Sequence, residues 1–262
     1  MTDLDRPIAA DWLALRRTAD TAARDLAGGL VDRCAAELTQ REGPVTVIDI
    51  GAGTGANQAY LQSRLGLPSR WVLLDHDATL LGAASGGDRR VVGGIEQVDA
   101  LVSSVTGPCL VTCSALLDLL TAPQLDGLGA VLARRRVPGL FSLTVDGRVG
   151  FDPGHDDDHA VTAAFNEHQA RSGRPGPAAA ARLESRCAAL GLRTETASTP
   201  WLLGSGSEPL VTRLLTERVS AALEQRPDLA ARCRAWLALR LEQAASGALG
   251  VTVGHTDLLV LP

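Results

Sequence analysis

The sequence contains no lysine, and all 25 of its basic residues are arginine. A P-loop phosphate site, a Schiff-base enzyme and a tyrosine–lysine dehydrogenase pair each need the lysine ammonium group. Arginine cannot replace it as an acid, a base or a nucleophile, because its pKa lies above about 12. The composition therefore excludes these three kinds of site.

Long apolar runs and paired cysteines are also missing. No stretch approaches the roughly 18 apolar residues of a membrane span, and acidic residues interrupt the first dozen positions, so we expect a cytoplasmic protein without a leader. The five cysteines form no CxxC pair, which argues against a disulfide framework or a zinc cluster. A net charge of −5 argues against nucleic acid or an anionic membrane as the partner.

Short β-branched runs alternate with amphipathic segments along most of the chain. This alternation is typical of a parallel sheet with helices on both faces, an α/β fold. The expected strands are 45–50, 71–75, 89–94, 109–115, 139–145, 192–199 and a long closing strand within 249–262. The expected helices include 9–26, 56–66, 77–85, 96–104, 122–135, 159–171, 178–190, 208–224 and 228–246.

A glycine turn, Gly51-Ala52-Gly53-Thr54-Gly55, joins the first expected strand to the next helix. Glycines let the backbone turn sharply and let a ligand approach it beside a helix N-terminus. As GxGxG the turn suits S-adenosylmethionine, and as GxGxxA it also matches a dinucleotide fingerprint. Asp75 ends the second strand, where either fold places a carboxylate for ribose hydroxyls. The turn alone leaves both ligands open.

Two neighbouring residues separate these alternatives. Asp49 lies inside the first strand, where a dinucleotide-binding strand usually has apolar residues, and a buried acid is costly unless it is paired. A methyltransferase uses an acid near this position to orient the loop and to receive the amino end of the cofactor. The single tyrosine, Tyr60, has no lysine partner, so the short-chain dehydrogenase interpretation fails.

With these motifs, the sequence resembles a class I, Rossmann-like S-adenosylmethionine-dependent methyltransferase, and more loosely a group of small-molecule methyltransferases from high-GC bacteria. The matching segments are DIGAGTG (49–55), LLDHD (73–77), VDAL (98–101), TCSALLD (112–118) and GVTVGHTDLLVLP (250–262). The resemblance implies a doubly wound, mostly parallel seven-stranded sheet whose last strand is antiparallel. The fourth strand lacks the NPPY-type motif of many enzymes that methylate nucleic acids.

The resemblance also implies a set of cofactor contacts. The loop residues Asp49, Gly51, Ala52 and Gly53 would hold S-adenosylmethionine. Asp75 would bind the ribose, and either His76 or Asp77 would touch the adenosine, with helix capping as the alternative role of Asp77. Asp99 would reach the adenine amine, and Cys113 and Ser114 would lie at the strand end next to the transferable methyl.

Methyl transfer from a sulfonium needs positioning more than it needs a catalytic triad. A base is required only where the acceptor must lose a proton, and Asp118 and His168 are the candidates. Trp12 and Arg16 lie on a first helix that could cover the acceptor and bind it. Three consecutive aspartates in HDDDH (155–159) cannot all face one ion from a regular element, so we expect no metal site.

We therefore predict a methyltransferase acting at O or N of a small-molecule acceptor, as a monomer or a homodimer. One domain is expected over 1–262, with a helical cap (1–44), a cofactor-binding core (45–145) and a part with acceptor-side helices and closing strands (146–262). A non-catalytic cofactor-binding relative or partner subunit is the alternative from another class, and an NAD-linked oxidoreductase is a third.

Overall fold

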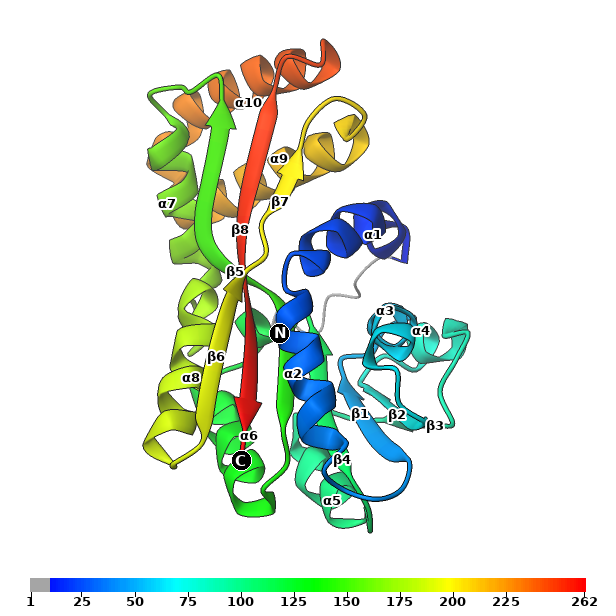
Figure 1. Cartoon of the computed structure of the whole chain (residues 1–262). Helices are drawn as coiled ribbons and strands as arrows, with labels where there is room; N and C mark the ends of the chain where they lie inside the picture. Colours follow the sequence, from blue (N-terminus) through cyan, green and yellow to red (C-terminus); the bar gives the residue numbers. More distant parts are fainter. Residues whose placement is uncertain (1–9) are drawn as a thin grey trace.

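The structure is a computed structural model that describes residues 10–262 (Figure 1). The first nine positions, on which the expectation about a leader partly rests, lie outside the described residues. The helices are α1 (Ala10–Asp25), α2 (Gly28–Leu38), α3 (Ala56–Leu65), α4 (Ala78–Ala83), α5 (Val98–Ser103), α6 (Ala122–Arg135), α7 (Asp158–Gln169), α8 (Ala179–Ala189), α9 (Glu208–Gln225) and α10 (Ala230–Ala245). Among residues 10–262, no helix is both long and apolar enough to cross a membrane.

One sheet joins all the strands of the described chain. They are β1 (Val45–Ile50), β2 (Ser69–Asp75), β3 (Arg89–Val92), β4 (Cys109–Ser114), β5 (Gly139–Asp152), β6 (Arg193–Ser198), β7 (Trp201–Leu203) and β8 (Gly250–Leu261). The strand order is β3-β2-β1-β4-β5-β8-β6, and β7 pairs separately with β8. The first five strands of this order are parallel, whereas β8 is antiparallel to its partners. The doubly wound fold with a reversed last strand is confirmed, and β7 is an eighth strand.

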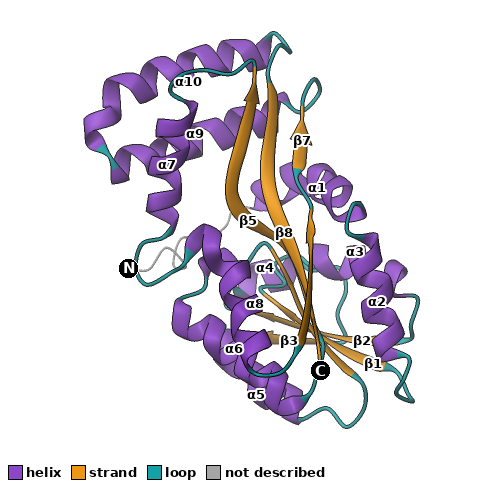
Figure 2. Cartoon of the chain, turned by 60° about the vertical axis from the view of Figure 1, so that its left-hand side comes forward, coloured by secondary structure: helices purple, strands orange, loops and turns teal. Residues whose placement is uncertain are grey.

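Helices cover both faces of the sheet (Figure 2). On one face α5, α6 and α8 pack on β4 and β5 through an apolar cluster that includes Leu101, Leu128 and Leu183. On the other face α2, α3 and α4 pack through a second cluster that includes Leu38 and Leu61. The central strands β1 and β4 are buried on both sides, which explains their continuous apolar runs in the sequence, whereas the edge strands β3 and β6 are largely exposed.

The upper half of the molecule rests on an extension of two strands. Strand β5 has 14 residues and β8 has 12, so both continue well past the ends of β1 and β4, and β7 joins them at the top (Figure 1). Helices α1, α7, α9 and α10 pack around this extension through a third apolar cluster, which we call the upper cluster. The expected strand 139–145 is therefore too short, and it continues through VDGRVGFD to Asp152.

The HDDDH segment fastens α7 to α10. Asp158 accepts hydrogen bonds from Trp236 Nε1 at 2.7 Å and from Arg240 Nη2 at 2.5 Å, and Arg240 is completely buried. Asp157 forms an ion pair with Arg232. Within residues 10–262, no three His, Cys, Asp or Glu side chains gather as metal ligands would. This acidic run therefore has a structural role.

We expect Asp158→Ala to lower the free energy of unfolding by about 3 to 5 kcal/mol, because it leaves the charge of Arg240 buried without its anion. Urea denaturation monitored by circular dichroism measures the loss. Asp156→Ala is the matched control, because Asp156 is an exposed neighbour in the same turn. Equal free energies of unfolding for Asp158→Ala and Asp156→Ala would contradict the structural role of Asp158.

Candidate functional site

The glycine turn lies at the carboxyl end of β1, and its backbone needs glycine at three positions. Gly51, Gly53 and Gly55 have φ values of +64°, +51° and +83°, a region that side chains disfavour. Gly53 N–H donates to Asp75 Oδ2 at 2.7 Å, and Asp77 N–H donates to Asp75 Oδ1 at 2.9 Å. The structure thus joins the glycine turn to the acid at the end of β2, the two motifs that the sequence assigns to one cofactor.

Asp75 keeps capacity for a ligand. It is 6% exposed, and a carboxylate can accept about four hydrogen bonds, of which the two backbone amides use two. His76 is exposed beside it, with Nδ1 3.3 Å from Asp75 Oδ1. Val92, which pairs with Asp75 in the β2–β3 register, is 57% exposed. A carboxylate, an imidazole and an uncovered apolar side chain form an edge suited to a nucleoside.

Two leucines lie over the glycine turn. A Cβ atom on Gly51 would be 3.0 Å from Leu116 Cδ1, and one on Gly53 would be 3.6 Å from Leu13 Cδ1. Leu116 follows β4, and Leu13 comes from α1. The turn is therefore partly covered, which the sequence did not reveal. A ligand lying along the turn would meet these two side chains.

Asp99 is not brought to this edge, which corrects the prediction from the resemblance. It forms ion pairs with Arg134 at 2.8 Å and Arg135 at 2.9 Å at the C-terminal end of α6, and these two arginines lower its pKa. The 3₁₀ turn Ile95–Gln97 lies between β3 and α5, so Asp99 falls within α5 and not directly after β3. The segment that follows β3 directly is Gly93–Gln97, so these residues replace Asp99 as neighbours of Asp75.

A buried polar layer supports the glycine turn from below. Asp49 is fully buried and accepts a hydrogen bond from Asn57 Nδ2 at 2.6 Å, and Asn57 Oδ1 accepts from Arg24 Nη2 at 2.8 Å. Thr112 on β4 completes the layer, 3.2 Å from Asn57 Nδ2. Burial raises the pKa of Asp49 to about 7, against the opposing effects of Asn57 and of the Arg24 charge. Among the described residues, Asp49 Oδ2 has no partner.

The charge of Arg24 also acts on a second buried acid. Asp257 of β8 accepts from Leu143 N at 2.8 Å and from Thr199 Oγ1 at 2.7 Å. Burial raises the pKa of Asp257, and the charge of Arg24 opposes this. Arg24 is 4% exposed and lies 3.7 Å from the centre of the Tyr60 ring. Its guanidinium thereby joins α1 to α3 through Asn57 and Tyr60.

The residues at the end of β4 face opposite ways. The Cys113 side chain belongs to the apolar core beneath α5 and α6, and burial raises its pKa well above the usual value. Only the backbone of Cys113 reaches the strand end, so its side chain is not a cofactor contact as predicted. Ser114, one residue later, is half-buried on the other face, on the side of Asp49 and Thr112. The alternation of side chains along a strand explains the difference.

Asp118 follows β4, and the charge of Arg16 on α1 acts on it. Burial raises the pKa of Asp118 to about 6, and the charges of Arg16 and Arg174 oppose this rise. Arg16 donates to Asp20 at 2.7 Å and lies 5.5 Å from the centre of the Trp201 ring. Trp201 in turn packs on His255, whose pKa burial and Arg16 lower to about 4. The cation that acts on Asp118 is thus itself packed beside Trp201, which contacts His255.

His168 and Trp12 lie away from Asp118. His168 Nε2 is 3.0 Å from Glu224 Oε2 between α7 and α9, and it also contacts Arg171. This arrangement gives His168 a place in an ion-pair cluster and not in the site, which corrects its assignment as a base. Trp12 packs on the upper cluster with Arg213 5.1 Å from its ring centre, so it anchors α1 to α9.

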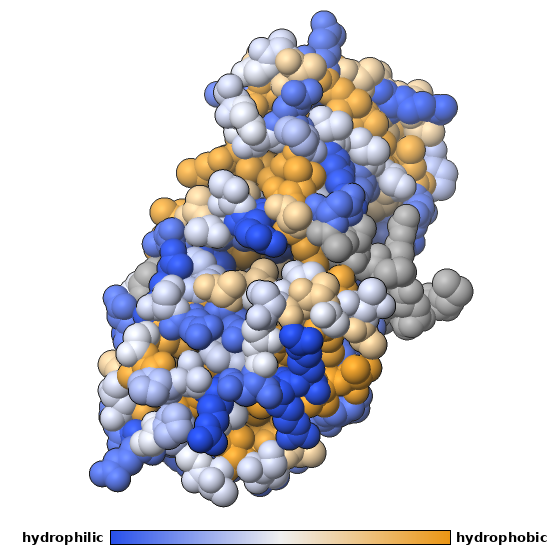
Figure 3. Space-filling view, turned by 90° about the vertical axis from the view of Figure 1, so that its right-hand side faces the viewer, coloured by the Kyte–Doolittle hydropathy of each residue, from blue (hydrophilic) through white to orange (hydrophobic). Residues whose placement is uncertain are grey.

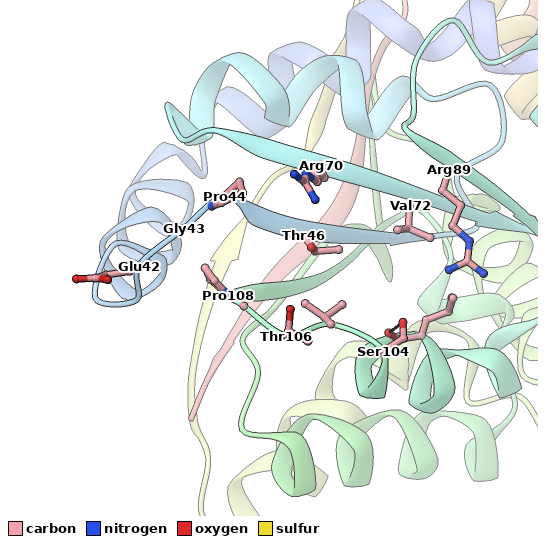
Figure 4. A pocket seen from close by; sticks show the side chains of 13 residues that line it. Glu42, Gly43, Pro44, Thr46, Arg70, Val72, Arg89, Ser104, Thr106 and Pro108 are labelled. Atoms are coloured by element: carbon pink, nitrogen blue, oxygen red, sulfur yellow. Dashed lines mark hydrogen bonds between the residues drawn. The ribbon is translucent and has the colours of Figure 1, made fainter.

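A hollow of about 420 Å³ lies at the opposite edge of the sheet (Figure 4). It is lined by the strand beginnings at Pro44, Thr46 and Pro108, with Arg70 and Arg89 at its rim. Open α/β sheets bind their ligands at the carboxyl ends of the strands, so this hollow is not the candidate site. The candidate site is the edge formed by the glycine turn, Asp75 and Asp118.

The space-filling view from the side of α1, α3 and α4 shows apolar surface gathered at mid-height, next to polar side chains (Figure 3). Large apolar side chains that remain exposed include Leu26 at 59%, Val92 at 57% and Leu202 at 71%. Of these, Val92 belongs to the candidate site, because it pairs with Asp75.

No family model matches the sequence, and no curated protein matches it. Among solved structures, a cyclopropane-fatty-acyl-phospholipid synthase-like protein from Lactobacillus casei is 16% identical, with a TM-score of 0.53 over 97% of this chain and 94% of that chain. A candidate type II methyltransferase from Anaeromyxobacter dehalogenans is 16% identical, with a TM-score of 0.51 over 89% and 94%. A plantazolicin methyltransferase in complex with SAH is 12% identical, with a TM-score of 0.47 over 98% and 92%. The chain has the class I methyltransferase fold, and these identities establish the fold alone.

Proposed function

We propose that the protein transfers the methyl group of S-adenosylmethionine to O or N of a small-molecule acceptor. The observation that carries the proposal is the union of the glycine turn with Asp75, whose carboxylate keeps two acceptor positions beside an exposed imidazole. The class I methyltransferase fold is consistent with it. A net charge of −5 supports a small molecule as acceptor over nucleic acid.

Different residues of the chain would bind the cofactor, accept the proton and contact the acceptor. The sulfonium cofactor supplies a methyl carbon that is already activated. Asp75 and the turn at Gly51–Gly55 would hold the nucleoside end and the amino acid end of the cofactor. Asp49, in β1 just before the turn, would accept the positive charge of the cofactor's amino group. Asp118 would accept the proton of the acceptor, because its raised pKa suits a base near neutral pH. Arg16 and Trp201 would form the wall beside that acceptor.

Isothermal titration calorimetry with S-adenosylhomocysteine is the direct test. We expect saturable binding at micromolar concentrations, and a folded sample that gives no heat at high-micromolar ligand would refute the proposal. Preferential binding of NADH would indicate an oxidoreductase. Binding of S-adenosylhomocysteine without transfer of labelled methyl to any member of a metabolite panel would indicate a non-catalytic binding protein.

The rate of methyl transfer should rise with pH around an apparent pKa near 6, because Asp118 accepts a proton only when it is ionised. Asp118→Asn should lower kcat by about 100-fold and remove this rise. Initial rates between pH 5 and 8 measure both effects. Asp126→Asn, at an exposed acid on α6, is the matched control and should keep the profile of the unchanged protein. A profile that survives in Asp118→Asn would exclude Asp118 as the base.

A further inference from the structure

Arg218, on the face of α9 that packs against α7, is buried without an anion. It is 3% exposed, and in the part of the chain that the structure describes Nε and Nη1 have no hydrogen-bond acceptor. Its contact is with the Phe165 ring of α7, whose centre lies 4.1 Å from the guanidinium carbon. Burial alone lowers the pKa of Arg218 to about 10. A guanidinium is still charged at that pKa, so Arg218 is a cation at neutral pH.

The other buried arginines of residues 10–262 have oxygen acceptors. Arg24 donates to Asn57, and Arg240 donates to Asp158 and to Pro153 O. Arg174 donates to Arg171 O. A buried charge destabilises a protein unless it is paired. Arg218 differs from the remaining three because its guanidinium has no oxygen acceptor among the described residues, and its contact is with the Phe165 ring.

The surroundings of Arg218 connect it to the candidate site. Leu215 and Val219, one turn before it and directly after it on α9, belong to the upper cluster. The same cluster contains Leu143, on β5 just past its pairing with β4, and Ala115 directly after β4 packs against it. The neighbours of Arg218 on α9 thus share an apolar cluster with residues that follow the paired part of β4 and β5.

We propose that Arg218 binds an anionic group of the methyl acceptor, so that the acceptor is an acidic small molecule carrying a carboxylate or a phosphate. This inference rests on the proposed function. A guanidinium offers parallel N–H donors that match two oxygens of either group, and apolar surroundings strengthen such a pair. The Phe165 ring contacts the guanidinium and would hold it in position when no anion is bound. The leucines and valines around it suit the apolar body of an acceptor.

Stability measurements separate a binding role from a structural one. Arg218→Met removes an unpaired buried charge, so in buffer without carboxylate or phosphate its Tm should equal or exceed that of the unchanged protein. Arg240→Met is the matched control, because it breaks a buried pair with Asp158, and its Tm should fall. A fall in Arg218→Met as large as that in Arg240→Met, or a failure to fold, would overturn the inference.

Ligand titration tests the anion itself, with benzoate, inorganic phosphate and the uncharged benzamide as probes. Benzoate or phosphate should raise the Tm of the unchanged protein saturably, by about 3 °C at ten times its Kd. Benzamide should have no effect, and Arg218→Met and Arg218→Gln should not respond to either anion. Equal responses of the variants and the unchanged protein, or no response to either anion, would overturn the inference.

The two anions also distinguish the acceptor classes. A response to benzoate alone indicates a carboxylate, and a response to phosphate alone indicates a phosphate ester. Calorimetry with S-adenosylhomocysteine on the same samples keeps the two proposals apart. Cofactor binding without an anion response refutes only the role of Arg218. An anion response without cofactor binding refutes the methyltransferase proposal and leaves Arg218 as an anion site of another function.

Discussion

Asp75→Asn should weaken the binding of S-adenosylhomocysteine by about 100-fold. Both carboxylate oxygens of Asp75 accept backbone N–H groups, from Gly53 and from Asp77. An amide has one oxygen, so its NH2 group would face one of these donors and open the glycine turn. The ribose hydroxyls would also lose an ionised acceptor, and hydrogen bonds to a charged group contribute about 1.5 to 3 kcal/mol each. Calorimetric Kd values measure the loss.

Asp88→Asn is the matched control for this experiment. Asp88 also accepts a backbone N–H, from Trp71 at 2.7 Å, but near the beginning of β2, away from the glycine turn. We expect its Kd for S-adenosylhomocysteine to remain within about twofold of the unchanged value. If Asp75→Asn binds as tightly as Asp88→Asn while both remain folded, Asp75 does not contact the nucleoside.

Arg24→Met should lower the free energy of unfolding by about 3 to 5 kcal/mol, since a broken buried network leaves uncompensated charge. The positive charge of Arg24 opposes the rise in the pKa values of two buried acids, Asp49 and Asp257. Urea denaturation at pH 7 measures the loss. Arg64→Met is the matched control, because Arg64 contacts the same Tyr60 ring from an exposed position and should cost under about 1 kcal/mol.

The loss in Arg24→Met should depend on pH. The pKa of Asp49 is about 7 in the folded protein against 3.8 for an ordinary aspartate, so the folded state binds the extra proton between these values. The contribution of Asp49 to the free energy of unfolding is therefore highest below about pH 4 and falls as the pH rises toward 7. Without Arg24 the pKa of Asp49 in the folded protein should rise further, so the fall should continue above pH 7, and a second change, Asp49→Asn, should restore part of the stability at pH 7. An Arg24→Met variant that is equally destabilised at pH 4 and pH 7 would contradict this account.

The core of the fold was readable from the sequence because its signals are local. The runs VTVIDI and CLVTCS are buried on both faces, and each is followed by a segment with helical periodicity. The strand extension was missed because VDGRVGFD contains charged residues and glycines, and its exposed residues alternate with half-buried ones. Strand β7 was missed because three residues give too short a pattern.

The sequence could place the parts of the candidate site that a motif fixes, and could not place partners that are distant in the chain. Asp75 and the glycine turn lie within one β-α-β unit, so their motifs predicted one ligand for both, and the hydrogen bond between Gly53 and Asp75 is a finding of the structure. The role of Asn57 could not be predicted, because a polar residue on the first turn of a helix is usually solvated. The proximity of Arg24 to Asp257 joins residues more than two hundred positions apart, and local sequence cannot reveal it. A polar residue within an apolar strand, such as Asp257 in DLLVL, is the available signal.

The pairing of β8 has a consequence for how the chain reaches this structure. Strands β5, β6 and β7 each align against β8, and β8 is the last of the strands in chain order. Until residues 250–261 have been synthesised, β6 and β7 have no neighbour and β5 has an open edge. Open edges of this kind pair readily with other chains. Nascent chains shorter than about 250 residues should therefore be the species that aggregates during production, and chaperones that shield strand edges should raise the yield of folded protein.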